Sequence, residues 1–212
     1  MSSSQWLIPL GYLAGSIPFG LLIARVSRGV DVRSVGSGNI GATNVLRAAG
    51  SGAAALTLIL DAMKGWAPVA AAQALGGSER LVAAVGLAAF LGHLYPIFLG
   101  FHGGKGVATF LGVLLALNPR VASLIVAIWL LIAVIVRYSS VAALIASASS
   151  PAVVWLFDGR RSYVALTVIL FVFVLIRHRE NLRRLVAGEE RRIGQKPRVN
   201  DASLSPRDRS AA

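Results

Sequence analysis

Apolar and polar segments alternate along most of this 212-residue chain. A helix that crosses a bilayer needs about 20 predominantly apolar residues, within a range of roughly 17–25. The first three apolar segments meet this length, whereas the fourth is short and is separated from the fifth by Asn118-Pro119-Arg120. The fourth and fifth segments therefore form either two short spans or a re-entrant hairpin. We expect about seven membrane helices, with five as the alternative, over residues 6–24, 53–75, 81–99, 107–117, 121–136, 141–157 and 163–176.

The composition supports an all-α integral membrane protein. Hydrophobic residues make up 56% of the chain and charged residues only 14%, and the mean hydropathy is +0.70. A soluble domain of this length would need more polar surface. We expect one polytopic membrane domain over residues 1–194, followed by a basic tail over residues 195–212 whose Pro, Ser, Asp and Arg content predicts disorder. The first apolar segment lacks the positive residues that precede a cleavable signal, so we expect it to be retained.

The distribution of Lys and Arg predicts the orientation of the helices. Cytoplasmic loops of membrane proteins carry an excess of these residues. With the N-terminus outside, the inner loops and the C-terminal end carry 16 of the 21 cations and the outer loops carry four. We therefore expect an outside N-terminus and a cytoplasmic C-terminus. This orientation places the loops around residues 36–44 and 100–106, the turn at Arg137 and the C-terminal end on one cytoplasmic face.

The first of these loops, which we call the first glycine loop, runs Gly36-Ser37-Gly38-Asn39-Ile40-Gly41-Ala42-Thr43-Asn44. Glycine permits a positive φ and a close approach to a ligand, and successive amide groups can form a concave anion-binding nest. The Ser, Asn and Thr side chains add hydrogen-bond donors, and Arg33 and Arg47 flank the loop. A plain connector between helices would need none of these donors, so we expect a phosphate-binding loop.

Two nucleotide-binding motifs match this chain only superficially. The glycines of the first loop fit G-x-G-x-x-G, but that fingerprint follows a β-strand, and here an apolar helix precedes it. Gly104-Lys105 resembles the end of a P-loop, but Leu99 stands at the position of its first glycine and Gly106 at that of its Ser or Thr. We therefore expect neither a dinucleotide site nor a P-loop.

The second glycine loop (residues 100–106) ends in Gly103-Gly104-Lys105-Gly106, directly before an apolar helix. The first amide groups of a helix and its dipole favour anions, and the Lys105 ammonium adds a full positive charge. A lone interfacial lysine often only anchors a helix, but glycines on both sides favour ligand binding. We therefore expect this run to bind a second anionic group.

Other polar positions have a structural and a functional interpretation. Asp61 and Lys64 lie one helical turn apart within the second apolar segment, where they form either a structural ion pair or a support for the site. Arg137 is either a topological signal or a supporting residue. His178 and Asn181 share one helical face, which predicts that they dock against protein. We expect His178 to donate a hydrogen bond rather than to act as a general base.

Several enzyme classes are excluded or disfavoured because the sequence lacks the residue types or spacings that they need. The absence of cysteine excludes disulfides, thiolate metal sites and a cysteine nucleophile. Acyltransferases that use CoA thioesters through a His-x4-Asp pair are disfavoured, because no histidine is followed by Asp at that spacing. No cluster of aspartates is present to hold magnesium, so we expect no metal.

Together these stretches resemble the PlsY family of bacterial acyl-phosphate:glycerol-3-phosphate acyltransferases. The resemblance covers about residues 5–194. It implies a seven-helix enzyme of the bacterial inner membrane, with its active site facing the cytoplasm, that transfers a fatty acyl group from acyl phosphate to the sn-1 hydroxyl of glycerol-3-phosphate. The product would be lysophosphatidic acid, the first intermediate of phospholipid synthesis. The motifs that carry the resemblance are Ser16-Ile17-Pro18-Phe19-Gly20, the first glycine loop, Asp61-Ala62-Met63-Lys64-Gly65, residues 92–109 and Arg177-His178-Arg179-Glu180-Asn181.

The same resemblance assigns site residues. It implies catalytic roles for Ser37, Arg47, Lys105, His178 and Asn181. Phosphate groups would bind Gly36, Gly38, Asn39, Gly41, Thr43, Asn44, Gly103, Gly104, Gly106 and Ser140. Asp61, Lys64 and Arg137 would support these residues. The partners would be acyl phosphate, glycerol-3-phosphate and membrane lipid, with no cofactor and no nucleic acid, and an interaction with the enzyme that makes acyl phosphate stays open.

The alternative function is a transporter or receptor for a small organophosphate. Helices broken by glycine and charges inside the membrane are typical of transporters. A transporter should open to both faces and often contains an internal repeat. No repeat is evident here, and all the predicted anion-binding loops lie on one side.

Overall fold

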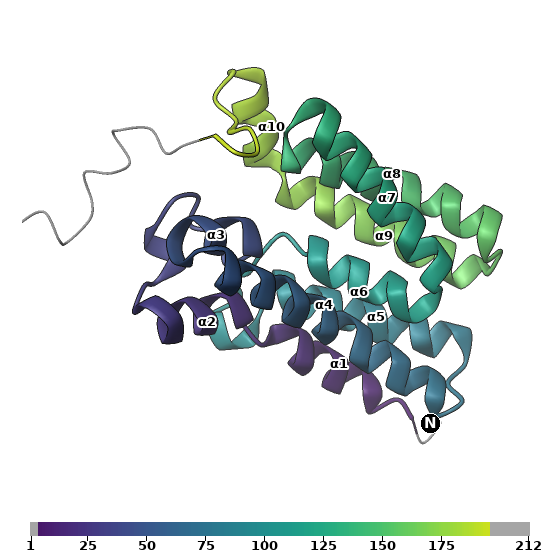
Figure 1. Cartoon of the computed structure of the whole chain (residues 1–212). Coiled ribbons are helices and arrows are strands. Elements are labelled where there is room, and N and C mark those ends of the chain that lie inside the picture. The colour runs from purple at the N-terminus through teal and green to yellow at the C-terminus, as the bar shows by residue number, and fades with distance from the viewer. Residues whose placement is uncertain (1–3, 196–212) are drawn as a thin grey trace, which may run out of the picture.

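The computed structural model describes residues 4–195, and within this range every regular element is helical (Figure 1). The all-α prediction is therefore confirmed, and the predicted tail from residue 196 onward lies outside the described residues. Two short 3-10 turns cover Val32–Ser34 (η1) and Ile97–Leu99 (η2). The α-helices are α1 Leu7–Ser16, α2 Phe19–Arg28, α3 Ala42–Ala49, α4 Ser51–Ala74, α5 Glu79–Leu94, α6 Val107–Leu117, α7 Pro119–Val136, α8 Ser139–Phe157, α9 Arg161–Arg177 and α10 Arg179–Val186.

Helix length divides the apolar segments into two groups. α9 has 17 residues, the lower limit for a span, and continues into α10 across a bend of 53°. α6 has 11 residues and is about 16 Å long, half the thickness of a bilayer core. The described residues thus give five spans or six, and the predicted seven stays a prediction. The five that are long and apolar enough by themselves are Leu7–Arg28, Ser51–Ala74, Glu79–Leu99, Pro119–Val136 and Ser139–Phe157.

The first span is broken at Pro18, between α1 and α2. Proline lacks an amide N–H and clashes with the carbonyl of the preceding turn, so a helix rarely continues through it. The Ile17 carbonyl, released from helical bonding, accepts a hydrogen bond from the Lys64 ammonium on α4 at 2.8 Å. The break therefore provides a buried charge with a polar partner inside an apolar bundle.

Glycines bring two pairs of helices into backbone contact. Gly15 and Gly92 lie where α1 meets α5, and Gly65 and Gly112 lie where α4 meets α6. A Cβ atom on Gly112 would overlap the carbonyl oxygen of Ala62 on α4. Because small residues allow membrane helices to pack closely, these four glycines set the helix spacing in the N-terminal part of the bundle.

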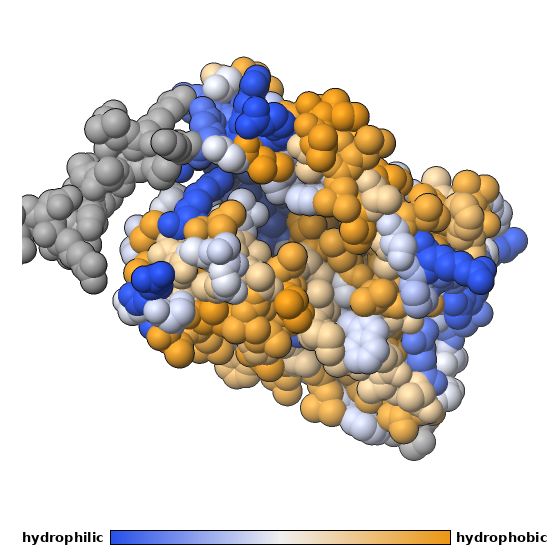
Figure 2. Space-filling model, in the orientation of Figure 1, coloured by the Kyte–Doolittle hydropathy of each residue, from blue (hydrophilic) through white to orange (hydrophobic). Residues whose placement is uncertain are grey.

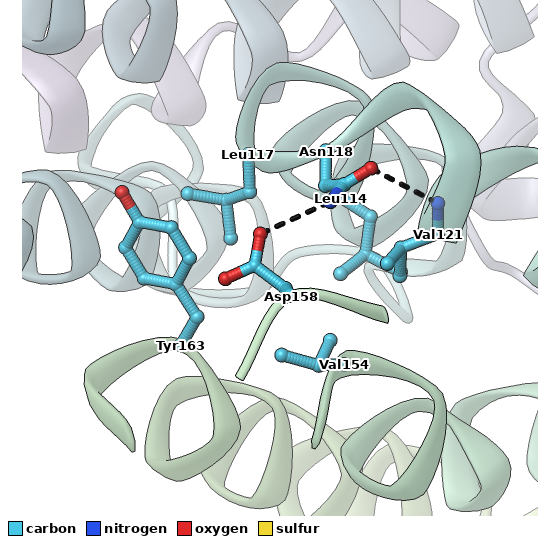
Figure 3. A pocket seen from close by; sticks show the side chains of 7 residues that line it. All are labelled: Leu114, Leu117, Asn118, Val121, Val154, Asp158 and Tyr163. Carbon is cyan, nitrogen blue, oxygen red and sulfur yellow. Dashed lines mark hydrogen bonds between the residues drawn. The ribbon is translucent and has the colours of Figure 1, made fainter. Parts of the chain in front are cut away.

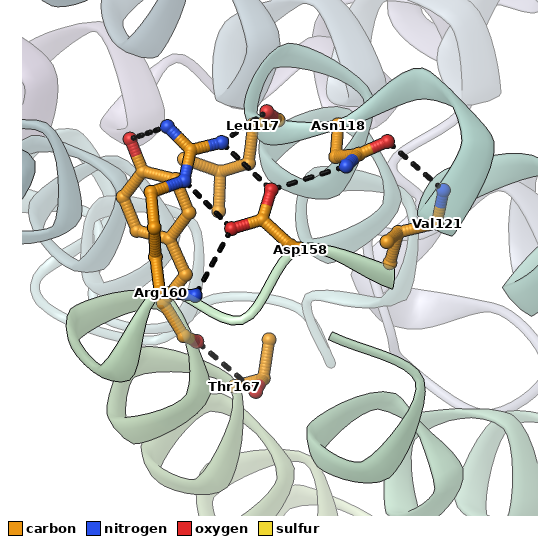
Figure 4. Close-up of polar contacts among 7 residues, drawn as sticks. Leu117, Asn118, Val121, Asp158, Arg160 and Thr167 are labelled. Carbon is orange, nitrogen blue, oxygen red and sulfur yellow. Dashed lines mark hydrogen bonds and ion pairs between the residues drawn. The ribbon is translucent and has the colours of Figure 1, made fainter. Parts of the chain in front are cut away.

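The two ends of the bundle differ in their chemistry. At the end near the N-terminus, the Asp158 carboxylate accepts from Arg160 Nε at 2.6 Å and from Asn118 Nδ2 at 3.1 Å (Figure 4). The second of these hydrogen bonds joins the α8–α9 turn to the α6–α7 turn. At the opposite end lie α3 and α10, and hydrophilic side chains gather between them (Figures 1 and 2). Both glycine loops, the α7–α8 turn and the C-terminal segment (residues 178–195) meet there. The predicted grouping is therefore observed, whereas its orientation relative to the membrane stays a prediction.

Candidate active site

The first glycine loop turns sharply before α3. Gly36 and Gly38 have φ angles of 61° and 67°, in the left-handed region that favours glycine, whereas Gly41 has φ −78°. The expected positive φ is thus present at the first two glycines and absent at the third. The amide groups of Ala42 and Thr43, at the start of α3, have no acceptor among residues 4–195. This helix start therefore keeps donors free for an anion.

Hydrogen bonds inside this loop occupy several groups that we expected to bind a ligand. The buried Asn44 side chain accepts from Ser37 N at 3.1 Å and donates to two backbone carbonyls at 2.8 and 3.0 Å. Gly38 N donates to a carbonyl at 3.1 Å, and Gly41 N donates to Asn39 Oδ1 at 2.9 Å. Asn44 therefore shapes the loop instead of contacting a ligand, which corrects its predicted role. Asn39 keeps its side-chain nitrogen free to donate.

Asp31 anchors the start of the loop. Its carboxylate accepts from Arg33 N and Arg33 Nε, both at 3.0 Å, and from a terminal guanidinium nitrogen of Arg25 at 2.9 Å. The hydrogen bonds from Arg33 hold the pKa of Asp31 well below its ordinary value. Asp31 is therefore ionised at neutral pH and is a poor base.

The second glycine loop packs tightly on the end of α5. Gly103 N and Gly104 N donate to the carbonyls of Leu94 and His93, each at 3.1 Å. These two amide groups are not available to an anion, which corrects the predicted mode of binding. The Gly103 and Gly104 carbonyls instead accept from the Arg177 guanidinium at 2.6 and 3.0 Å. The loop therefore fixes a cation that enters from α9.

Lys105 extends from this loop to the C-terminal segment. Gly106, directly after it, has φ 82° and allows α6 to start. The Lys105 ammonium donates to Asn181 Oδ1 at 2.5 Å. Burial, followed by the nearby charge of Arg184, lowers the pKa of Lys105 from 10.5 to about 8, while Glu190 opposes this shift. Lys105 therefore carries its charge at neutral pH and loses it in mildly basic solution.

Glu190 accepts hydrogen bonds from three polar side chains, which belong to helices α8 and α10. Its Oε1 accepts from Asn181 Nδ2 at 2.6 Å and from Ser140 Oγ at 2.8 Å, and its Oε2 accepts from Arg184 Nε at 2.8 Å. Burial opposes ionisation of Glu190, but these hydrogen bonds hold its pKa below the ordinary value. Asn181 and Ser140 thus lie beside Lys105, bound to a carboxylate that the sequence did not indicate.

Arg137 fastens the C-terminal segment to the α7–α8 turn. Its backbone adopts φ 60°, its carbonyl accepts from Ile193 N at 2.6 Å, and its guanidinium donates to the Ile193 carbonyl at 3.1 Å. Arg137 therefore holds the segment that carries Glu190, which is consistent with a supporting role.

His178 lies at the bend between α9 and α10, where it is 3% exposed. Its Nδ1 lies 2.8 Å from the Val174 carbonyl, and a carbonyl only accepts, so Nδ1 carries the proton. Burial, followed by the charge of Lys105, lowers the pKa of His178 to about 4. The ring is therefore neutral at pH 7, and its free Nε2 is an acceptor. This corrects the expectation that His178 donates a hydrogen bond to a ligand.

A cavity of about 360 Å³ opens between the two glycine loops. Two arginines line it: Arg33 from η1 and Arg177 from the end of α9. The hollow drawn in Figure 3, at the opposite end of the bundle, is too small to hold a water molecule and admits no ligand. The space for a small anion therefore lies at the glycine loops. Its lining consists of Arg33, Ser37, Gly38, Asn39, Ile40, His102, Gly103 and Arg177.

The buried ion pair lies beneath the second glycine loop. Lys64 Nζ and Asp61 Oδ1 are 2.6 Å apart, and both side chains are at most 3% exposed. His93 Nδ1 lies 3.7 Å from the same Asp61 oxygen, and the His93 carbonyl accepts from Gly104 N. The pair is therefore structural and also lies under the loop that carries Lys105.

Three charged side chains at the site were not predicted: Arg177, Arg184 and Glu190. No spacing rule connects them with their partners, because Glu190 meets Ser140 from 50 positions along the chain. One signal was available, since Glu189 and Glu190 form an acidic pair in an otherwise basic segment. A carboxylate in such surroundings usually has a specific partner.

These features define a class of protein: a polytopic membrane bundle with a cavity at one end that two arginines line. Comparison with known proteins identifies the family. The sequence profile of the glycerol-3-phosphate acyltransferase family matches residues 5–188. A glycerol-3-phosphate acyltransferase of Methylorubrum populi is 54% identical over 88% of this chain and 91% of its own length, and one of Agrobacterium fabrum is 52% identical over 88% and 90%.

A solved structure agrees with this assignment. The crystal structure of PlsY, an integral membrane glycerol 3-phosphate acyltransferase, in its glycerol 3-phosphate form, superimposes with a TM-score of 0.87 and 42% identity. The alignment covers 91% of this chain and 96% of the other. The chain therefore belongs to the glycerol-3-phosphate acyltransferase family.

Proposed function

We propose that this chain transfers an acyl group from an acyl phosphate to the sn-1 hydroxyl of glycerol-3-phosphate, releasing lysophosphatidic acid and phosphate. The observation that carries the proposal is a cavity at the polar end of an apolar bundle, lined by Arg33, Arg177 and both glycine loops, the second of which carries Lys105. A related solved structure of PlsY is described in a lysophosphatidic acid form, which supports the same product for this chain.

Both proposed substrates carry phosphate, and the site offers two groups of cations. Arg33 and Arg177 line the cavity. Lys105 lies with Arg47 and Arg184 on the side of the C-terminal segment. Two phosphate groups held on these two sides would bring the hydroxyl and the acyl carbonyl together, and such positioning supplies a large part of a typical rate enhancement.

The chemistry is a single acyl transfer. The sn-1 oxygen bonds to the acyl carbonyl carbon, the bond from that carbon to the phosphate oxygen breaks, and the hydroxyl proton moves to an oxygen of the departing phosphate. Negative charge develops on the carbonyl oxygen, where preorganised donors such as the Lys105 ammonium stabilise it. Asp31 is ion-paired and His178 has a low pKa, so the phosphate itself is the suitable proton acceptor.

The proposed location is the bacterial inner membrane, with the site on the cytoplasmic face. The bias of Lys and Arg toward this end of the bundle supports that orientation. Both soluble glycerol-3-phosphate and the enzyme that makes acyl phosphate would then have access from the cytoplasm. A transporter for organophosphates is the alternative, and the location of the cavity at one end of the bundle disfavours it.

The reaction itself tests this proposal. Purified protein given palmitoyl phosphate and glycerol-3-phosphate should release lysophosphatidic acid and phosphate in equal amounts, and turnover should continue in EDTA. Palmitoyl-CoA should not serve as the donor, because the sequence lacks a His-x4-Asp pair. Reactions without glycerol-3-phosphate are the control for simple hydrolysis. Sustained turnover with palmitoyl-CoA would contradict the donor, and uptake of glycerol-3-phosphate into vesicles without acylation would favour a transporter.

Replacement of His178 by glutamine tests the absence of a protein base. Glutamine keeps an acceptor on a side chain of similar length, so His178→Gln should retain activity with an unshifted pH profile of kcat/KM. General-base catalysis typically contributes about 10²–10⁴-fold. A loss of that size, together with the disappearance of an acidic limb from the profile, would make His178 the base.

A further inference from the structure

The carboxylate of Glu190 lies at the centre of the hydrogen bonds beside Lys105. Its side chain is 9% exposed and belongs to the segment that follows α10. It accepts from Asn181, Ser140 and Arg184 at 2.6–2.8 Å, so α8 and α10 are both joined to this one carboxylate. No other described carboxylate has hydrogen bonds to Asn181 or Ser140.

These contacts determine how the Asn181 amide is oriented. A carboxylate only accepts hydrogen bonds and an ammonium only donates them. The Asn181 nitrogen must therefore face Glu190, and its oxygen must face Lys105, as the distances of 2.6 and 2.5 Å show. Without Glu190, the amide could rotate and direct its N–H groups at the ammonium, which would then lose its acceptor.

We infer that Glu190 is a positioning residue, which orients Asn181 so that its carbonyl oxygen holds the Lys105 ammonium in place for the substrate. The inference rests on the proposed function, since it assigns a role within that same site. Charge-assisted hydrogen bonds of this kind are stronger than neutral ones, and they add geometric specificity.

The contacts disfavour another role, in which Glu190 occupies the place of a substrate phosphate. Such a mimic should bind the cations of the site directly. In the described part of the chain, however, neither Lys105 nor Arg47 is a hydrogen-bond or ion-pair partner of Glu190. Its charged partner there is Arg184, on the adjoining helix α10, and its other partners are neutral. The carboxylate thus leaves the remaining Lys105 donors free.

The charges around Lys105 provide a second test of the role of Glu190, through the pKa of Lys105. Arg47 on α3, Arg177 on α9 and Arg184 on α10 disfavour its ammonium, whereas Glu190 favours it. His178 adds no charge at neutral pH, because its ring is neutral. Removing the Glu190 charge should therefore lower the pKa of Lys105, and the basic limb of the kcat/KM profile should move to lower pH.

Glu190→Gln is the first test, with Glu189→Gln as its matched control. Glu189 is the exposed neighbour, so its variant should match the wild type in kcat, KM and pH profile. Glu190→Gln should lower kcat about 10-fold at pH 7, because a charge-assisted contact is lost while the side-chain length is kept. Its basic limb should lie at lower pH than that of the control.

A double-mutant cycle tests whether Glu190 acts through Asn181. Asn181→Ala alone should be impaired, and adding Glu190→Gln to it should cost less than about 2-fold more. Full additivity would overturn the inference, as would an unshifted basic limb in Glu190→Gln. A lower KM for glycerol-3-phosphate with unchanged kcat would show instead that the carboxylate competes with phosphate. Since every comparison is made against wild-type turnover, failure of the proposed function itself would appear as an inactive wild type.

Discussion

Removal of the Lys105 ammonium is expected to lower kcat/KM for acyl transfer about 10²- to 10³-fold, the usual cost of deleting one preorganised donor from an active site. Lys105 lies at the start of α6, and the Asn181 oxygen holds its ammonium. Lys105→Ala removes the charge and also leaves that oxygen without its donor. The measurement is steady-state release of phosphate from palmitoyl phosphate at saturating and limiting glycerol-3-phosphate.

The pH dependence separates charge from structure at this position. Burial lowers the pKa of Lys105 to about 8, so the required ammonium is present below that pH and lost above it. Wild-type kcat/KM should therefore fall as the pH rises through about 8. Lys105→Arg keeps its charge at that pH and should lack this limb, even if its activity is lower. Arg120→Ala, an exposed cation at the other end of the bundle, is the control. A Lys105→Ala variant with more than about a tenth of wild-type activity would contradict the role in charge stabilisation.

Replacement of Gly112 by alanine should cause a large loss of stability. A Cβ at this position overlaps the Ala62 carbonyl, and backbone cannot move aside as a flexible side chain can. Overpacking of this kind costs typically about 1–3 kcal/mol and sometimes more. For a protein of this size, the expected fall in Tm is about 2–12 °C, measured by thermal unfolding in detergent.

Gly52→Ala is the matched control for this change, because Gly52 lies in the partner helix α4 with no atom near its Cβ position. Its Tm should be unchanged or slightly raised, since alanine favours helix more than glycine does. Equal Tm values for the two variants would mean that the contact between α4 and α6 is loose enough to admit a methyl group.

The helices were predictable because long apolar segments leave few alternatives in a bilayer. The lengths of these helices were harder to predict. α6 ends after 11 residues because Asn118 caps α7, accepting from Arg120 N at 3.1 Å, and Pro119 cannot continue the previous helix. The sequence shows this break but does not reveal whether both pieces cross the membrane. Pro18 marked a second break, within a segment that was predicted as one helix.

The site was predictable as a set of loops and not as a set of contacts. Glycines and polar residues located both loops, because few structural roles require that composition. Whether a backbone amide group is free to bind an anion depends on carbonyls that are distant in the sequence. The Gly103 N–H, which we expected to bind an anion, donates to the Leu94 carbonyl instead. The protonated nitrogen of His178 likewise depends on the Val174 carbonyl. Such pairings exist only in the folded chain.

The position of Glu190 and Asn181 after the last apolar helix has a consequence for biosynthesis. A chain is made from its N-terminus at about 5–20 residues per second, so the first glycine loop enters the membrane interface early. The partners of Lys105 leave the ribosome only after α9 has been made. A partly inserted chain therefore holds both glycine loops without the groups that contact Lys105. If the proposed function holds, translation order delays acyl transfer until the whole bundle has been assembled.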